Sequence, residues 1–249
     1  MRQALDRFYR WCQRLLVPEL RPSQYAFAEI LNETLARRTS WLDLGCGRRL
    51  LPEWMPDTIE KELRGRVARR VGTDLDLASL RDHAALSARV QASADALPFS
   101  PRSFDIVSAN MVMEHIEQPG RVLAEIGRVL RPGGVFVFHT PNRRYWAIRI
   151  ARVVPQRAKA LLVRLLEGRA EEDVFPTRYR FNDAGEIARL AADAGFHVER
   201  LDAVSSSPVT AMLGPLVLVE LCWIRWLRRP GQASSRSNFI GVLRAGADR

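Results

Sequence analysis

The sequence has few of the residues that build disulfide frameworks or metal sites. Its 249 residues include three cysteines, and these stand far apart, at Cys12, Cys46 and Cys222. No pair of them has the spacing of a metal site, and an odd, scattered set is not typical of a disulfide framework. We therefore expect no metal centre, and a reducing compartment is the simplest interpretation.

Long uninterrupted hydrophobic runs are also lacking. The longest run, from Pro208 to Leu227, contains Glu220 and Arg225, which favours a buried or interfacial helix over a membrane-spanning one. The N-terminal segment has an arginine every few positions and no apolar core, so it does not resemble a secretory signal. The expected location is the cytoplasm, with peripheral attachment to the inner face of the membrane as a further hypothesis.

Lysine is nearly absent, since the 38 basic residues are arginine apart from Lys61 and Lys159. Codon bias accounts for arginine in place of lysine, but it does not account for where the charge lies. The formal net charge is +10, and residues 141–249 alone hold 18 basic and 11 acidic side chains. With 47% hydrophobic and 27% charged residues, the chain is typical of a globular protein with a full core.

Strand and helix patterns alternate along the chain. Short strands are expected at 40–44, 69–74, 89–92, 104–109, 135–140, 196–204 and 238–244. Helices are expected at 3–16, 23–37, 121–130 and, with Asn182 as N-cap, 183–194. The alternation indicates βαβ units. The predicted fold is α/β, a Rossmann-like doubly wound seven-stranded mostly parallel sheet, with N-terminal helices and helical insertions at the ligand edge.

We expect residues 1–249 to form a single domain with four parts. These parts are an N-terminal helical cap (1–39), a core (40–140), a basic helical insertion (141–181) and the C-terminal part of the sheet (182–249), which includes an apolar insertion at 205–236.

Four motifs follow the first four expected strands, at the edge where open parallel sheets bind ligands. They are Asp43-Leu-Gly45-Cys46-Gly47, Asp74 in Gly-Thr-Asp-Leu-Asp, Asp95-Ala96, and Asn110-Met-Val-Met-Glu114-His115. Glycines let the backbone approach a ligand closely, and a carboxylate such as Asp74 can accept hydrogen bonds from both hydroxyls of a ribose. Asp95 can accept from an adenine amino group, with Leu75 and Leu97 as apolar faces for the ring.

Together with Phe104-Asp-Ile-Val and Arg128-Val-Leu-Arg-Pro-Gly-Gly, these motifs resemble the class I S-adenosylmethionine (SAM)-dependent methyltransferases. The resemblance is greatest to the type 11 group, which includes quinone and other small-molecule methyltransferases. It covers about residues 40–140, which would then be the SAM-binding core. It implies SAM as the cofactor and methyl transfer to a small-molecule or lipid-like acceptor as the activity.

The same resemblance implies positions for the cofactor. The Gly45–Gly47 loop would line the methionine and ribose side, Asp74 would hold the ribose hydroxyls, and Asp95 with Ala96 would contact the adenine. The full expected cofactor-binding set is Asp43, Gly45, Cys46, Gly47, Asp74, Leu75, Asp95, Ala96 and Asn110. His115 is the candidate general base for a hydroxyl or amine acceptor, and a structural role at a helix start is the alternative. Methyl transfer can also proceed without a base, because alignment with the sulfonium supplies much of the effect.

The chain departs from the family pattern at two points. Arg49, with Arg48 beside it, replaces the third glycine, and this arginine either pairs with the cofactor carboxylate or points to solvent. The step from Asp43 to Asp74 is long and contains Pro52 and Pro56. We therefore expect the first crossover helix to be displaced or broken.

Two unusual segments suggest where the acceptor comes from. Residues 143–169 hold eight basic side chains against the single acid Glu167, and 208–229 is apolar with Trp223 and Trp226 near arginines. Basic amphipathic helices with tryptophan at the margin suit an anionic membrane surface. We hypothesise peripheral membrane contact through both segments; the alternative is a lid that packs on itself or on a second subunit.

Three rival functions remain at this stage. A nucleic-acid methyltransferase would also be basic, but no RNA-binding module is visible, and Asn110-Met-Val-Met lacks the Asn/Asp-Pro-Pro-Tyr/Phe signature of many base-amino methyltransferases, so nucleic acid is not an expected partner. A non-catalytic SAM-binding partner subunit is the second rival. The third is an NAD-dependent dehydrogenase, against which Leu50 stands in place of the final glycine of Gly-x-Gly-x-x-Gly.

Overall fold

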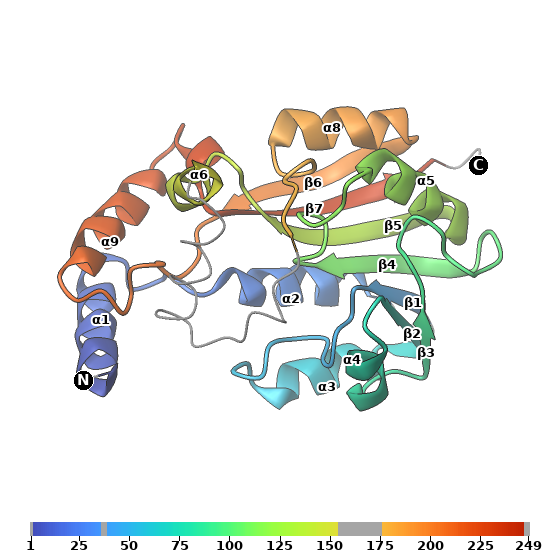
Figure 1. The fold of residues 1–249 in the computed structure, drawn as a ribbon, viewed down its shortest axis with the longest axis horizontal. Helices are drawn as coiled ribbons and strands as arrows, with labels where there is room; N and C mark the ends of the chain where they lie inside the picture. The colour runs from blue at the N-terminus through green and yellow to red at the C-terminus, as the bar shows by residue number, and fades with distance from the viewer. Residues whose placement is uncertain (1, 36–38, 154–175, 247–249) are drawn as a thin grey trace. The chain divides into compact units, whose positions relative to one another are not determined.

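The computed structural model describes residues 2–35, 39–153 and 176–246 (Figure 1). Two compact units make up the chain. We call residues 24–140, 178–202 and 239–249 the sheet unit, and residues 1–23, 141–177 and 203–238 the helical unit. That the whole chain forms one domain stays a prediction.

A seven-stranded sheet forms the centre of the sheet unit, in the order β3-β2-β1-β4-β5-β7-β6. The four pairs from β3 to β5 are parallel, and Figure 1 shows β7 running in the opposite direction. The strands are β1 (Thr39–Leu44), β2 (Val67–Asp74), β3 (Ala88–Gln91), β4 (Phe104–Asn110), β5 (Leu130–Pro141), β6 (Phe196–Val204) and β7 (Asn238–Ala245). The predicted α/β Rossmann-like fold with a mostly parallel sheet is confirmed.

The central strands are apolar on both faces because helices cover them. In β1 and β4, Trp41, Leu42 and Val107 are fully buried, and Leu42 pairs in register with Val71 of β2 and Val107 of β4. In β5, Phe136 and Phe138 are fully buried as well. Continuous apolar strands of this kind are why the sequence predicted the sheet correctly.

Five helices of the described chain accompany this sheet: α2 (Ser23–Thr34), α3 (Asp57–Gly65), α4 (Leu77–Asp82), α5 (Pro119–Val129) and α8 (Ala184–Asp193). In Figure 1, α3 and α4 lie beside β2 and β3, and α5 and α8 lie together at the other end of the strand order. As expected, the first crossover helix, α3, is displaced: it begins only after Pro56.

Two sequence predictions about helix ends are wrong. The N-cap of α8 is Asp183, whose side chain accepts from the backbone N–H of Gly185, whereas Asn182 is buried and donates to Thr140 Oγ1 at 2.8 Å. The helix expected at 121–130 ends at Val129, and β5 already begins at Leu130, which pairs with Phe104 of β4. The pairing of Leu130 with β4 determines where α5 ends, and this pairing cannot be deduced from the local sequence.

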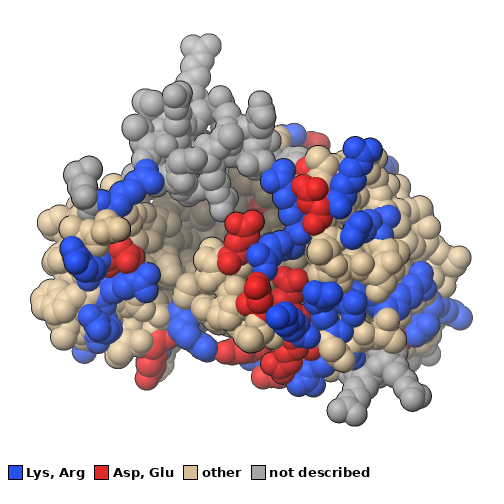
Figure 2. All heavy atoms as spheres, turned by 90° about the horizontal axis from the view of Figure 1, so that it is seen from below, with Lys and Arg blue, Asp and Glu red and all other residues tan. Residues whose placement is uncertain are grey.

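Basic and acidic side chains lie interspersed on the face drawn in Figure 2. Many arginines of the sheet unit are matched by a carboxylate, as in the pairs Arg131–Asp105, Arg189–Asp193, Arg200–Asp202 and Arg244–Glu199. Exposed pairs of this kind contribute little to stability. Because each pair cancels one positive charge on the sheet unit, the net positive charge is not spread evenly over the chain.

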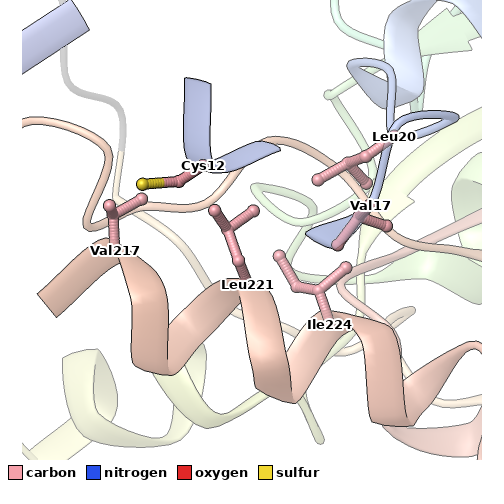
Figure 3. Close-up of a cluster of buried hydrophobic side chains, with 6 residues drawn as sticks. All are labelled: Cys12, Val17, Leu20, Val217, Leu221 and Ile224. Carbon is pink, nitrogen blue, oxygen red and sulfur yellow. The ribbon is translucent and has the colours of Figure 1, made fainter. Parts of the chain in front are cut away.

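The helical unit contains α1 (Arg2–Leu16), α6 (Trp146–Val153), α9 (Leu216–Leu227) and the short 3-10 helix η2 (Ala233–Ser235). Helices α1 and α9 lie side by side, and Figure 3 shows the buried side chains between them: Cys12, Val17, Leu20, Val217, Leu221 and Ile224. Residues 154–175 of the expected basic insertion lie outside the described residues.

Glu220, the acid that interrupts the longest apolar run, is buried within the helical unit. Its carboxylate accepts from the Tyr145 hydroxyl, from Thr210 N at 2.8 Å and from Thr210 Oγ1 at 2.6 Å. These bonds offset the cost of burying the charge. None of the helices in the described ranges combines the length and hydropathy that crossing a bilayer requires.

Candidate functional site

The loop after β1 has the backbone shape that a close ligand approach requires. Gly45 and Gly47 have φ values of +59° and +54°, in the left-handed region that favours glycine, and Cys46 N between them donates to Thr73 O at 3.1 Å. A Cβ on Gly45 would lie 2.5 Å from Val112 Cγ2, whereas one on Gly47 would meet nothing within 4 Å. The loop is therefore closely packed at Gly45 and open at Gly47.

Asp74, at the end of β2, lies directly against this loop. Its Oδ2 accepts from Gly47 N at 2.8 Å, and its Oδ1 accepts from Asp76 N at 2.9 Å. Each carboxylate oxygen has a second lone pair, so both can still accept a hydrogen bond from a ligand. The half-buried side chain thus has the position and acceptor capacity needed to bind a diol beside the loop.

Asp43 and Cys46 are more deeply placed than Asp74. The Asp43 carboxylate is 6% exposed and accepts from Ser108 Oγ of β4, which in turn accepts from Trp41 Nε1 at 2.7 Å. Burial, with smaller contributions from Asp74 and Glu60, raises the pKa of Asp43 to about 7. Cys46 is buried, which raises the pKa of its thiol, so it acts as a small packing residue and not as a nucleophile.

The ends of β2 and β3 present an open rim. Leu75 is 61% exposed, and its carbonyl oxygen accepts from Gln91 Nε2 at 2.9 Å, which joins the two strand ends. Asp95 and Ala96 are exposed, with Asp95 accepting from Ser93 Oγ. Leu97, expected as the second apolar face for an adenine, is instead buried. Leu75 is therefore the exposed member of that predicted pair.

Asn110, at the end of β4, is held by two neighbours. Its Nδ2 donates to Gln24 Oε1 at 2.9 Å, and its Oδ1 lies 2.9 Å from His139 Nδ1. His139 is buried and stacks on Phe27, and burial lowers its pKa to about 3. A neutral imidazole with its proton on Nδ1 satisfies this pair. Sequence patterns did not predict the contacts of Asn110 with Gln24 and His139, because these contacts join distant segments.

Glu114 and His115 follow β4 with different environments. Glu114 is 3% exposed and its side chain accepts from Thr140 Oγ1 at 3.3 Å, and burial raises its pKa to about 7. The His115 side chain is 31% exposed, with Nε2 3.9 Å from Glu114 Oε1. The expected candidate base is thus accessible, and the buried carboxyl group of Glu114, from the same sequence motif, lies beside it.

Arg49, which replaces the third glycine, lies exposed on the surface, in agreement with the second of the two sequence interpretations. Its Nη2 lies 2.6 Å from Asp57 Oδ1, and its Nε lies 3.9 Å from Glu60 Oε2, so the side chain pairs with α3. Arg48 lies 3.9 Å from Asp82. Because α3 begins only after Pro56, its carboxylates lie next to Arg49 and pair with the guanidinium charge.

Comparison with known proteins identifies the family. A family model described as a methyltransferase domain matches residues 7–201. A ubiquinone biosynthesis O-methyltransferase from Thiobacillus denitrificans is 30% identical over 184 residues, which cover 68% of this chain and 69% of the relative. Another protein of that name, from Methylococcus capsulatus, is 28% identical over 210 residues, or 81% of each chain.

A solved structure supports the same fold. The SAM-dependent methyltransferase from Mesorhizobium loti aligns with a TM-score of 0.58 and 18% identity, covering 89% of this chain and 97% of its own. At this identity the likeness concerns the fold alone. Since the family model spans most of the chain, the chain belongs to the methyltransferase-domain family and is a SAM-dependent methyltransferase.

Proposed function

We propose that SAM binds along the rim formed by the ends of β1, β2 and β3. The observation that carries this proposal is the double acceptance by Asp74, which ties the end of β2 to Gly47 and keeps lone pairs for a ribose diol. The open space at Gly47 leaves room for the cofactor, and the exposed residues Leu75 and Ala96 offer an apolar surface to its adenine. The remaining expected residues, Asp43, Gly45, Cys46, Asp95 and Asn110, support or extend this rim.

The acceptor in this proposal is a small, lipophilic ring compound that receives the methyl group on a hydroxyl oxygen. Two relatives that are 28% and 30% identical are named as O-methyltransferases of ubiquinone biosynthesis, and both align over two thirds or more of their length. That identity supports the reaction class more strongly than the individual compound. A quinone-like phenol or catechol is therefore the first acceptor to test.

His115 is the candidate general base in this reaction. SAM supplies a methyl group already activated on a sulfonium, so the chain has to align the acceptor and remove its hydroxyl proton. The accessible His115 imidazole follows the end of β4, and its Nε2 lies 3.9 Å from Glu114 Oε1.

Replacing His115 with alanine is expected to reduce methyl transfer about a hundredfold or more while leaving the SAM affinity unchanged. The measurement is transfer of labelled methyl from SAM to an alkylated catechol and to a lipid extract, beside calorimetry with SAM. His197→Ala, which removes an exposed histidine on β6, is the matched control and should retain full activity. If His115→Ala turns over at the wild-type rate, His115 is not the base; if no preparation methylates any hydroxyl acceptor, the proposed reaction class is wrong.

Peripheral membrane contact forms the second part of the proposal, and α9 supports it. One stripe of the helix, Val217, Leu221, Ile224 and Leu227, is buried, while another stripe remains exposed and apolar: Leu216, Val219, Trp223 and Trp226. The exposed stripe recurs at helical spacing and is followed by Arg228 and Arg229. Tryptophan beside arginine suits the headgroup region of an anionic bilayer.

Vesicles of phosphatidylglycerol are therefore expected to carry the full chain upward in a flotation gradient, and phosphatidylcholine vesicles are not. Val219→Asp should weaken flotation at least fivefold, because it places a charge on the apolar stripe. Trp54→Ala removes an exposed tryptophan from the sheet unit and should leave flotation unchanged. Equal flotation of wild type and Val219→Asp, or none with either vesicle, would remove α9 from membrane contact.

A further inference from the structure

The turn that follows β4 lies against the glycine loop. Leu44, the last residue of β1, pairs in register with Ala109 of β4. Beyond this pair, a Cβ on Gly45 would lie 2.5 Å from Val112 Cγ2, so the two segments are in close contact. The half-buried Asn110 therefore stands at the same edge of the sheet as the rim proposed above for SAM.

His139 of β5 holds this turn through its side chain and through its backbone. It pairs with Asn110 in register, and its Nδ1 lies 2.9 Å from Asn110 Oδ1. Its carbonyl oxygen accepts from Met111 N, also at 2.9 Å. Met111 has a φ of +58°, in the left-handed region that residues other than glycine rarely adopt. The hydrogen bond from Met111 to His139 holds the backbone in this unfavourable conformation.

The imidazole of His139 is fixed in turn by its surroundings. His139 is 1% exposed, and its ring stacks on that of Phe27, with 5.8 Å between the ring centroids. Within the described part of the chain, Nε2 has no hydrogen-bond partner, so Asn110 is the only polar partner of the ring there. A phenylalanine, like Phe136 and Phe138 of the same strand, would fill this space without burying an unpaired nitrogen. What the histidine adds is the N–H that binds Asn110.

We propose that His139 is a positioning residue, which orients the amide of Asn110 toward the carboxylate of SAM. An amide oxygen only accepts, so the Nδ1–H of His139 fixes which end of the amide faces β5. The amide nitrogen is thereby directed to Gln24 Oε1, which accepts one of its two N–H groups at 2.9 Å. Among the described residues the second N–H has no partner, so it is available to a ligand.

The chemistry of the cofactor selects the group that this N–H binds. The methionine end of SAM carries a carboxylate, which accepts hydrogen bonds, and an ammonium group, which donates them. An N–H donor therefore matches the carboxylate, and hydrogen bonds to an ionised group are the stronger kind. The inference rests on the proposed binding of SAM along this rim.

Two substitutions at His139 separate positioning from packing. His139→Phe keeps a ring beside Phe27 and removes the N–H, whereas His139→Asn is smaller but has an amide nitrogen that can donate in place of Nδ1. We expect His139→Phe to weaken SAM binding about tenfold, the loss of one hydrogen bond to a charged group, without loss of stability in denaturant unfolding. His139→Asn should restore the affinity to within about threefold of the wild-type value. The reverse order of the two affinities would mean that His139 acts through packing alone and would overturn the inference.

Decarboxylated SAM identifies the group that Asn110 binds, because it differs from SAM in lacking the carboxylate. In calorimetry, His139→Phe should change its affinity less than about twofold. A general disturbance of the site would weaken both ligands equally, and that result would contradict the inference. Asn110→Ala and the double variant should each lose as much SAM affinity as His139→Phe, since His139 acts through Asn110. Losses that multiply would mean that His139 acts by another route.

His83→Phe is the matched control, because it replaces a second buried histidine, at the end of α4, whose Nε2 also has no partner in the described residues. It should bind SAM within about twofold of the wild type. Asp74→Ala reports on the proposed rim itself. If Asp74→Ala loses SAM binding and His139→Phe does not, the positioning inference fails and the rim stands. If neither variant loses SAM binding, the rim is wrong and the inference fails with it.

Discussion

Asp74→Ala is expected to weaken SAM binding by about two orders of magnitude or more. Each hydrogen bond from a ribose hydroxyl to a charged carboxylate contributes about 1.5 kcal/mol or more, so losing two costs about 3 kcal/mol, or a hundredfold in Kd. Alanine also removes the acceptor that holds Gly47 N at 2.8 Å, which frees the loop. Both effects reduce the affinity for SAM, so weaker binding is expected whichever of the two contributes more.

Calorimetry with SAM and with its demethylated product measures this loss. Asp193→Ala is the matched control, since it removes an exposed aspartate of the sheet unit that pairs along its own helix with Arg189, at 3.0 Å. Denaturant unfolding of each variant separates lost binding from lost folding. A folded Asp74→Ala protein that binds SAM within twofold of the wild type would show that the cofactor lies elsewhere.

The parts of the fold that sequence predicted well are those where one strand carries its own signal. β1 and β4 are short apolar runs that end in polar motifs, and parallel pairing then places those motifs at one edge. The contact between Asp74 and Gly47 follows from this rule, because β1 and β2 are neighbours with Asp43 opposite Gly72. The positive φ of Gly45 and Gly47 follows from glycine in a tight turn.

The predictions that failed concern residues whose contacts are made by segments distant in the sequence. Leu97 looked like an exposed ring face, but it is buried, and its backbone N donates to Glu125 of α5 at 2.8 Å. The sequence left open whether Arg49 pairs with the cofactor carboxylate or points to solvent, and it held no sign that Asp57 of α3 lies beside it. Asn182 fits an N-cap by residue type, yet Thr140 of β5 accepts from its amide. Local patterns hold no information about which of several possible partners is brought near.

Glu114 connects the candidate site to stability, and Glu114→Gln is expected to change how stability depends on pH. Burial raises the pKa of Glu114 to about 7 in the folded chain, above the ordinary value of 4.5. The folded state therefore binds this proton more tightly than the unfolded state does, so the wild type loses stability as pH rises from about 4.5 to about 7. The loss amounts to about 3 kcal/mol, because each unit of pKa shift corresponds to about 1.4 kcal/mol. Glutamine cannot ionise, so the variant escapes that loss.

The wild-type curve alone cannot test this, because other buried groups titrate in the same range. Burial lowers the pKa of His83 to about 4 and of His139 to about 3, so these histidines make stability rise with pH below about 6.5, opposite to Glu114. The difference between Glu114→Gln and wild type cancels them, and it should grow by about 3 kcal/mol in favour of the variant between pH 4.5 and pH 8. Glu117→Gln, which removes an exposed carboxylate from the same segment, is the matched control. A constant difference for Glu114→Gln would mean that Glu114 ionises in the folded chain as it does in water, and it would then carry a negative charge beside His115 throughout the neutral range.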